Sequence, residues 1–311
     1  MFRRQVSRAP ESGGQRRGCG AGGGSLRKTL AGVAWVTSPR AIFDRAALLA
    51  QEGVALLLTC AVFAGLALAQ TPADQPVSRT DQNSLTAHAQ LLEKAAKGGI
   101  DIYFEGDSIT RRWGATDYPN FLANWKQNFF GWNAADFGWG ADTIQNILWR
   151  LHNGELDGVN PKVIVLLAGT NNVGRTNPAG GDAAKVEDIT KGIKAILDVM
   201  QVKAPRATII LTAIFPRNDN IAVVPTIDRI NANIAKFADG KRIRYVNINN
   251  KLADKDGKLF DGMMGDGLHP TLQGYQVWAD ALKPIFTDLL GPPAKDDHAP
   301  PPTGDPSAQA R

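Results

Sequence analysis

A serine at position 108 stands where a strand-like segment passes into a helix-like one. The apolar run Ile102-Tyr103-Phe104 is followed by Glu-Gly-Asp and then by Ser108. A serine at the start of a helix lies beside unpaired backbone N–H groups and the positive end of the helix dipole, which both stabilise negative charge. A nucleophilic hydroxyl fits this setting. Gly-Asp-Ser is also ordinary turn sequence, so Ser108 needs support from other residues.

A serine nucleophile needs a base, and the chain has four histidines to compare. His298 belongs to a proline-rich C-terminal segment, and His88 and His152 belong to helical stretches without a polar cluster. His269 remains, in the loop Gly-Asp-Gly-Leu-His-Pro. Asp266, three residues earlier, can accept the Nδ1–H of this imidazole and leave Nε2 free to take the serine proton. The alternative is that Asp-Gly forms a turn and His-Pro only opens a helix.

Two further loops can supply donors for an oxyanion. Asn171 follows another apolar run, and its side-chain amide could act together with backbone N–H groups of Ser108 and of the turn at Gly140 and Ala141. The alternative is that Asn171 only shapes a turn. This chemistry requires no metal and no cofactor, and the sequence has no His-Glu-x-x-His, cysteine cluster or phosphate-binding P-loop.

Short apolar runs that alternate with amphipathic segments must position these residues. Strands are expected at 100–104, 133–137, 163–168, 208–215 and 243–248. Helices are expected at 84–97, 118–128, 143–151, 186–202, 226–238 and 272–290. This alternation predicts an α/β fold with a parallel sheet and right-handed crossovers. Ligands bind such sheets at the carboxyl ends of the strands, where all the candidate loops fall.

Both ends of the chain differ from this pattern. Residues 1–69 resemble a leader whose uncharged apolar run 54–69 ends in Ala-Leu-Ala, as a secretory signal peptide does before its cleavage site. An uncleaved membrane anchor is the alternative. We expect a linker at 70–79, a globular domain at 80–291 and, because of its prolines, a disordered tail at 292–311. The mature protein is then exported, periplasmic or extracellular, without a stable membrane anchor.

The charge of the chain is concentrated in the expected leader. The net charge is +5, and residues 1–69 contain nine Lys or Arg against three Asp or Glu, so the remainder is near −1. The basic pI therefore gives no reason to expect a nucleic-acid partner. Both cysteines, Cys19 and Cys60, fall in the leader, so we expect neither a disulfide nor thiolate chemistry in the mature chain.

Taken together, these blocks resemble the SGNH (GDSL-like) hydrolases, which are serine esterases and lipases. Within this superfamily the sequence is most similar to the catalytic subunits of platelet-activating factor acetylhydrolase and their bacterial relatives, over 137–143, 148–156 and 161–165. The resemblance covers roughly residues 100–290. It implies a three-layer, flavodoxin-like α/β fold with a five-stranded parallel sheet.

The resemblance also implies roles for the candidate residues. Ser108 would be the nucleophile, His269 the base and Asp266 the carboxylate that orients it. The asparagine in the third sequence motif of the family corresponds to Asn171. The family's oxyanion glycine stands directly before an aspartate, and this chain has Ala141 there, so both Gly140 and Ala141 remain candidates. Ala141 would be strained if its φ were positive.

The implied activity is hydrolysis of a carboxylic ester through an acyl-serine intermediate, on a small-molecule or glycan ester. We expect short acyl groups, acetyl above all. Trp113 and Trp139 are close in sequence to the nucleophile and the oxyanion turn, and could line a pocket or pack in the core. The alternatives are a glycan O-acyltransferase with the same residues and a non-catalytic exported binding protein of the same fold. The sequence does not indicate an oligomeric state.

Overall fold

The computed structural model describes residues 70–175 and 180–309, and the structural statements below concern these residues. Every described residue belongs to the same compact unit. The predicted leader and its apolar run 54–69 lie outside the described residues.

Five parallel strands form one sheet in the order β2-β1-β3-β4-β5. The strands are β1 (Ile102–Gly106), β2 (Ala134–Asp136), β3 (Val163–Leu167), β4 (Thr208–Thr212) and β5 (Ile243–Val246). Each neighbouring pair is parallel. All five strands were predicted, with ends that differ by at most three residues. The residues of β1, β2 and β3 are buried throughout, as expected for a sheet with helices on both faces.

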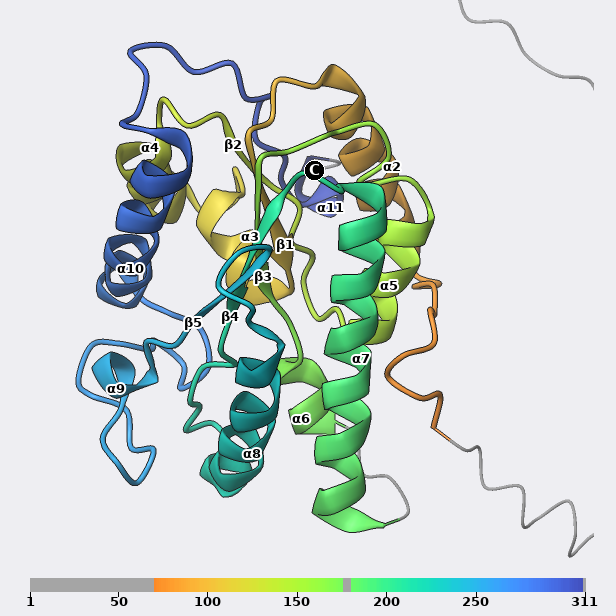
Figure 1. Ribbon diagram of the computed structural model, residues 1–311, viewed down its shortest axis with the longest axis vertical. Helices are drawn as coiled ribbons and strands as arrows, with labels where there is room; N and C mark the ends of the chain where they lie inside the picture. The colour runs from red at the N-terminus through yellow and green to blue at the C-terminus, as the bar shows by residue number, and fades with distance from the viewer. Residues whose placement is uncertain (1–69, 176–179, 310–311) are drawn as a thin grey trace, which may run out of the picture. The chain divides into compact units, whose positions relative to one another are not determined.

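Helices cover the sheet in two layers (Figure 1). One apolar core contains side chains of α2 (Gln82–Lys97), α5 (Ile144–His152), α7 (Gly181–Lys203) and α8 (Val224–Ile234). The other contains side chains of α3 (Ser108–Gly114), α4 (Pro119–Phe129) and α10 (Leu272–Leu290). Short helices complete the described fold: α6 (Thr170–Arg175), α9 (Asn249–Leu252) and α11 (Pro306–Gln309). This is the three-layer α/β architecture that the resemblance implied.

Trp113 belongs to the core and not to a pocket wall. Its side chain is fully buried, and its ring stacks on Tyr275 and Trp278 at centroid distances of 4.8 and 5.2 Å. Its indole N–H donates to Asn124 at 2.8 Å. Of the two roles expected for Trp113 from the sequence, packing in the core is therefore the correct one.

The segment 292–309, which we call the C-terminal strap, contradicts the predicted disorder. The Ala294 N–H donates to the Gly131 carbonyl at 2.8 Å, and the Asp297 carboxylate accepts from the Gly131 N–H at 2.7 Å. Further along, the ammonium of Lys94 donates to Thr303 Oγ1 at 2.8 Å. These individual hydrogen bonds hold the strap against the rest of the domain. The prediction of disorder depended on amino-acid composition, which gives no information about such bonds.

The expected linker is also anchored. The Ala73 N–H donates to the Asp188 carboxylate on α7 at 2.9 Å, and the Val77 N–H donates to the Gln145 carbonyl on α5 at 3.0 Å. Across the described ranges 70–175 and 180–309, no helix has the length and apolar character needed to span a membrane.

Candidate active site

Ser108, His269 and Asp266 lie in one hydrogen-bonded chain. Ser108 begins α3 directly after β1, and its Oγ lies 2.8 Å from Nε2 of His269. Nδ1 of the same imidazole lies 2.8 Å from Oδ2 of Asp266. The structure thus brings together the three residues that sequence analysis selected. A serine bonded to an imidazole that a carboxylate orients is the arrangement an activated nucleophile requires.

The loop of Asp266 keeps its carboxylate in place. The backbone N–H groups of Leu268 and His269 donate to Oδ1 at 3.0 and 2.8 Å, and a bridge between Met264 and Pro270 closes the loop. Burial acts to raise the pKa of Asp266, but the hydrogen bonds from these N–H groups and from the imidazole outweigh it and lower the pKa below its usual value. The carboxylate is therefore ionised at neutral pH.

His269 is held in its neutral form. Burial lowers the pKa of His269, the hydrogen bond to Asp266 raises it, and the nearby Arg112 guanidinium lowers it again, with a net pKa below the usual value. A neutral imidazole can accept the serine proton. Sequence analysis did not single out Arg112, whose Nη1 lies 3.5 Å from Asp266 Oδ2. Its position four residues after Ser108, on the same helix face, is the signal that could have indicated it.

The turn between β2 and α5 contains a strained residue. Ala141 has φ of 65°, in the left-handed region that favours glycine, whereas Gly140 is not among the glycines with positive φ. A Cβ at Gly140 would meet nothing within 4 Å. The backbone thus favours glycine at position 141, the place of the family's glycine, and the alanine there costs about 1 kcal/mol.

Two arginines hold this turn through its carbonyl groups. Arg79 Nη1 donates to the Gly140 carbonyl at 3.1 Å and lies 3.2 Å from Asp142 Oδ1. Arg175 Nη1 donates to the Ala141 carbonyl at 3.2 Å. Arginine side chains are donors only, so these contacts engage the carbonyl groups of Gly140 and Ala141 and do not occupy the N–H groups of these two residues. Neither arginine was singled out from the sequence.

Asn171 lies at the second position of α6, beside the same turn. Its Nδ2 donates to the Asp142 carbonyl at 2.9 Å, and the side chain is buried. A side-chain amide has two N–H groups, so one remains for an oxyanion. The buried guanidinium of Arg217 donates to the Thr170 carbonyl at 2.9 Å and fixes the backbone directly before Asn171.

A buried guanidinium connects β1, which leads to Ser108, to the turn at Gly140 and Ala141. Arg150 on α5 places Nη2 at 2.6 Å from Glu105 and Nε at 2.7 Å from Asp142, and also pairs with Glu155. Its Nη1 donates to the Phe137 carbonyl at 2.9 Å. All four charged side chains are buried. Sequence analysis missed this cluster, although a glutamate inside a strand-like run and an arginine inside an apolar helix were signals of buried charge.

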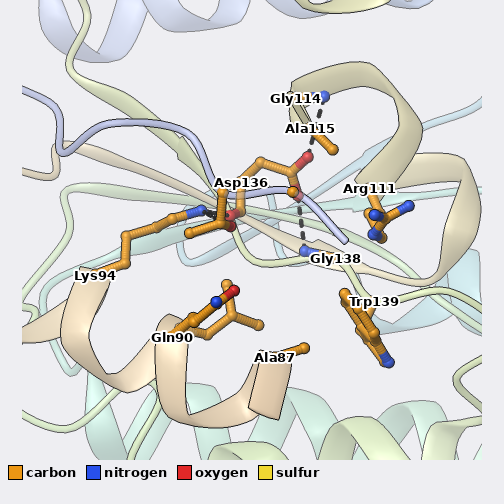
Figure 2. Close-up of a pocket in the computed structure, with 12 residues that line it drawn as sticks. Ala87, Gln90, Lys94, Arg111, Gly114, Ala115, Asp136, Gly138 and Trp139 are labelled. Atoms are coloured by element: carbon orange, nitrogen blue, oxygen red, sulfur yellow. Dashed lines mark hydrogen bonds between the residues drawn. The ribbon is translucent and has the colours of Figure 1, made fainter. Parts of the chain in front are cut away.

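Asp136 connects the far end of α3 to the oxyanion turn (Figure 2). Its Oδ2 accepts from the Gly114 N–H at 3.1 Å, and its Oδ1 accepts from the Gly138 N–H at 2.7 Å. The buried ammonium of Lys94 donates to the Asp136 carbonyl at 2.7 Å. A Cβ at Gly114 would come within 2.5 Å of Asp136 Oδ2, so the close approach requires glycine there. Asp136 therefore fixes the nucleophile helix relative to the turn.

Trp139, the second tryptophan that sequence analysis considered, faces this support structure. Its indole N–H donates to Ser84 Oγ at 2.9 Å, and the Arg111 guanidinium lies 4.9 Å from its ring centroid (Figure 2). The side chain is buried. Trp139 supports the turn from behind and is not among the residues that line the cavity beside His269.

A cavity of about 470 Å³ opens beside His269. Its wall combines the Arg112 guanidinium, the Asp266 carboxylate and the His269 imidazole with apolar and neutral polar side chains, among them Phe121, Pro270, Thr271, Leu272 and Gln273. Leu272 is 44% exposed. In the ranges 70–175 and 180–309, no three His, Cys, Asp or Glu side chains are grouped so that they could hold a metal ion.

The GDSL-like Lipase/Acylhydrolase family model matches residues 104–277, more than half of the chain. The chain therefore belongs to this family. Two curated proteins are similar to this chain in sequence. Platelet-activating factor acetylhydrolase IB subunit alpha1 of Homo sapiens is 27% identical over 227 residues, which are 71% of this chain and 92% of that protein. Subunit alpha2 of Bos taurus is 31% identical over 217 residues, 68% of this chain and 86% of that protein.

Solved structures show the same fold. A putative platelet activating factor protein from Streptococcus pneumonia has a TM-score of 0.53 at 22% identity, covering 66% of this chain and 92% of that one. A GDSL-like lipase from Bacteroides thetaiotaomicron has a TM-score of 0.53 at 20% identity, covering 66% and 98%. The predicted family and α/β fold are thus confirmed, and the chain is an ester-hydrolysing enzyme.

Proposed function

We propose that this chain is an exported serine esterase that removes short acyl groups, acetyl above all, from small-molecule or glycan esters. The observation that carries the proposal is the Ser108–His269–Asp266 chain, with both of its heteroatom distances at 2.8 Å. The site residues were predicted from sequence, and their roles below are those that this geometry supports best.

In the first half-reaction, Ser108 Oγ attacks the ester carbonyl carbon while His269 Nε2 takes the hydroxyl proton. The carbonyl oxygen becomes an oxyanion that accepts hydrogen bonds from the backbone N–H groups of Ser108 and Ala141 and from Asn171 Nδ2. When the tetrahedral intermediate collapses, the C–O bond to the alcohol breaks, and the imidazolium gives its proton to the departing alkoxide. The acyl group stays on Ser108.

In the second half-reaction, water attacks the acyl-serine. His269 takes a proton from the water, the same donors hold the oxyanion, and the Ser108 Oγ bond to the acyl carbon breaks with return of the proton. The free acid leaves. Asp266 orients the imidazole and stabilises its positive charge in both steps.

Two observations favour this function over the alternatives. The cavity beside His269 is large and the histidine side chain is 12% exposed, so water can reach the imidazole, as hydrolysis requires and acyl transfer to a sugar does not. The assembled serine–histidine–aspartate chain disfavours a binding protein without turnover. The acetyl preference is inferred from the curated relatives, which are acetylhydrolases.

A series of p-nitrophenyl esters tests the function. We expect the highest kcat/KM for acetate and a steady fall as the acyl chain lengthens, and Ser108→Ala should lose nearly all of this activity. A preference for chains beyond about eight carbons would contradict the short-acyl proposal. Adding a saccharide acceptor separates the acyltransferase, which would yield acylated sugar in place of free acid. N-terminal sequencing of protein recovered outside the cytoplasm tests export and cleavage of the leader.

A further inference from the structure

The cavity beside His269 adjoins the imidazole that serves the alcohol half of the substrate in the proposed reaction. His269 Nε2 delivers the proton to the departing alkoxide, so that oxygen has to be within hydrogen-bond reach of the imidazole. Asp266, His269 and Pro270 all contribute to the cavity wall. Its volume of about 470 Å³ is enough for a ring-sized alcohol. Because Ser108 and the predicted oxyanion donors do not line this cavity, we assign its wall to the alcohol half of the substrate and not to the acyl group.

Arg112 is the one cationic side chain among the described residues that line this cavity. Its only hydrogen bond within the described part of the chain is the long contact of Nη1 with Asp266 Oδ2 at 3.5 Å. Asp266 already accepts three shorter bonds, from the N–H groups of Leu268 and His269 and from the imidazole. The carboxylate thus does not depend on Arg112.

Neighbouring arginines are engaged far more closely. Arg111, on the same helix, donates from Nη2 to both oxygens of Asp117 at 2.8 and 2.9 Å. Arg217 donates from Nε to Asp219 at 2.8 Å and from Nη1 to a carbonyl. Arg112 instead keeps most of its five donors unused, while its guanidinium lies 5.5 Å from the ring centroid of Tyr118, which restrains its position.

A guanidinium whose one carboxylate contact is the 3.5 Å approach to Asp266 opposes the proposed reaction. During both half-reactions His269 becomes a cation, and a second cation nearby raises the energy of that state. An anionic group of the substrate beside Arg112 would cancel this repulsion and add charge-assisted hydrogen bonds of its own. The arrangement is unfavourable for a neutral alcohol and favourable for an anionic one.

Building on the proposed function, we infer that the alcohol half of the substrate carries an anionic group, a carboxylate or a phosphate, that pairs with Arg112. Arg112 is thus a specificity-determining residue. The guanidinium can bind either anion through two parallel N–H groups, and the apolar side chains of Phe121 and Leu272 would contact the body of the alcohol.

Three acetyl esters test this inference: 3-acetoxybenzamide, 3-acetoxybenzoate and 3-acetoxyphenyl phosphate. The readout is the ratio of kcat/KM for each anionic ester to that for the neutral amide, in wild type, Arg112→Gln and Arg112→Lys. Because intrinsic ester reactivity is the same for every variant, it cancels when these ratios are compared. Arg206→Gln serves as the matched control. It removes the same charge from an exposed position just before β4, at the amino-terminal ends of the parallel strands and not at their carboxyl ends, where Ser108 lies.

We expect a wild-type ratio at least about ten-fold above that of Arg112→Gln for one or both anions. Arg112→Lys should give an intermediate ratio, Arg206→Gln should match wild type, and salt should reduce the wild-type ratio. The relative size of the two ratios tells a carboxylate from a phosphate site. Equal ratios in wild type and Arg112→Gln would overturn the inference. If wild type hydrolysed none of the three esters, including the amide, the proposed esterase function itself would fail.

Discussion

Arg150 and Glu105 form a buried ion pair with 2.6 Å between Nη2 and Oε1, and this pair joins α5, the helix after the turn at Gly140 and Ala141, to β1, the strand that leads to Ser108. The same guanidinium also pairs with Asp142 and Glu155. Replacing Arg150 with Met would remove the cation that these three buried carboxylates share, and only Asp142 would keep an arginine, Arg79 at 3.2 Å. We predict a loss of about 3–5 kcal/mol in the free energy of unfolding, measured by urea denaturation.

The control for this prediction is Arg206→Gln, which is exposed and should change stability by less than about 0.5 kcal/mol. Arg150→Lys keeps one charge but cannot reach three carboxylates at once, so it should fall between wild type and the methionine variant. A methionine variant as stable as wild type would show that the pair is dispensable for the fold.

Ala141→Gly should stabilise the protein. The substitution removes the strain of a left-handed alanine, which exceeds the entropy that glycine adds to the unfolded chain, so we expect a gain of about 0.5–1 kcal/mol. Activity should be retained, since the donor at this position is a backbone N–H. Thermal unfolding measures the gain. Gly140→Ala is the matched comparison, because its backbone is not left-handed and its Cβ has open space. A destabilised Ala141→Gly would mean that the strain is absent.

The pH dependence of kcat/KM should follow His269. Burial and Arg112 lower the pKa of this imidazole, so activity should rise with pH along a limb whose midpoint lies below the usual histidine value. Arg112→Gln removes a lowering influence and should move the midpoint to higher pH. A pH–rate profile with a neutral ester measures both. A midpoint that moves to lower pH in the variant would contradict this account of the imidazole's surroundings.

Asp107, next to the nucleophile, should make stability pH-dependent. Burial raises the pKa of Asp107 to about 7, and its Oδ2 has no hydrogen-bond partner among the described residues. Between its usual value of 3.8 and about 7, the folded state binds more protons than the unfolded state, so stability falls as pH rises through this window.

When the pH rises from 5 to 7, the free energy of unfolding should therefore fall by roughly 2 kcal/mol less in Asp107→Asn than in wild type. The asparagine side-chain oxygen can still accept the hydrogen bond from the Ile109 N–H. Urea denaturation at the two pH values measures the difference. The same pH slope in both proteins would show that this carboxylate titrates normally in the folded state.

Removal of the C-terminal strap should destabilise the domain. A tail as disordered as its composition suggests could be removed without this loss. The strap contributes Thr303 to the buried Lys94 ammonium, and Asp297 to two backbone N–H groups before β2. A chain that ends at Gly291 should unfold at a lower urea concentration, and Thr303→Val, which loses one hydrogen bond, should lose about 1 kcal/mol. An unchanged midpoint for the shortened chain would mean that the strap is only loosely attached.

Much of the fold was predictable because its signals are local. Apolar runs gave all five strands, and the polar residues just after them gave Ser108 and Asn171 at the carboxyl edge of the sheet. His269 followed from elimination, since only four histidines exist. Local patterns could have drawn attention to Arg112 and Arg150, but these residues and Asp136 act on groups distant in the chain, which a local pattern does not identify. The strap was mispredicted for the same reason, because its contacts are long-range hydrogen bonds.

The most direct test of the central claim is reaction with a fluorophosphonate, followed by mass spectrometry of the labelled peptide. Wild type should carry one adduct on Ser108, Ser108→Ala should carry none, and His269→Ala should react at least about 10³-fold more slowly because the hydroxyl has lost its base. An adduct on another residue, or undiminished labelling of Ser108 in His269→Ala, would contradict the claim that this histidine activates this serine.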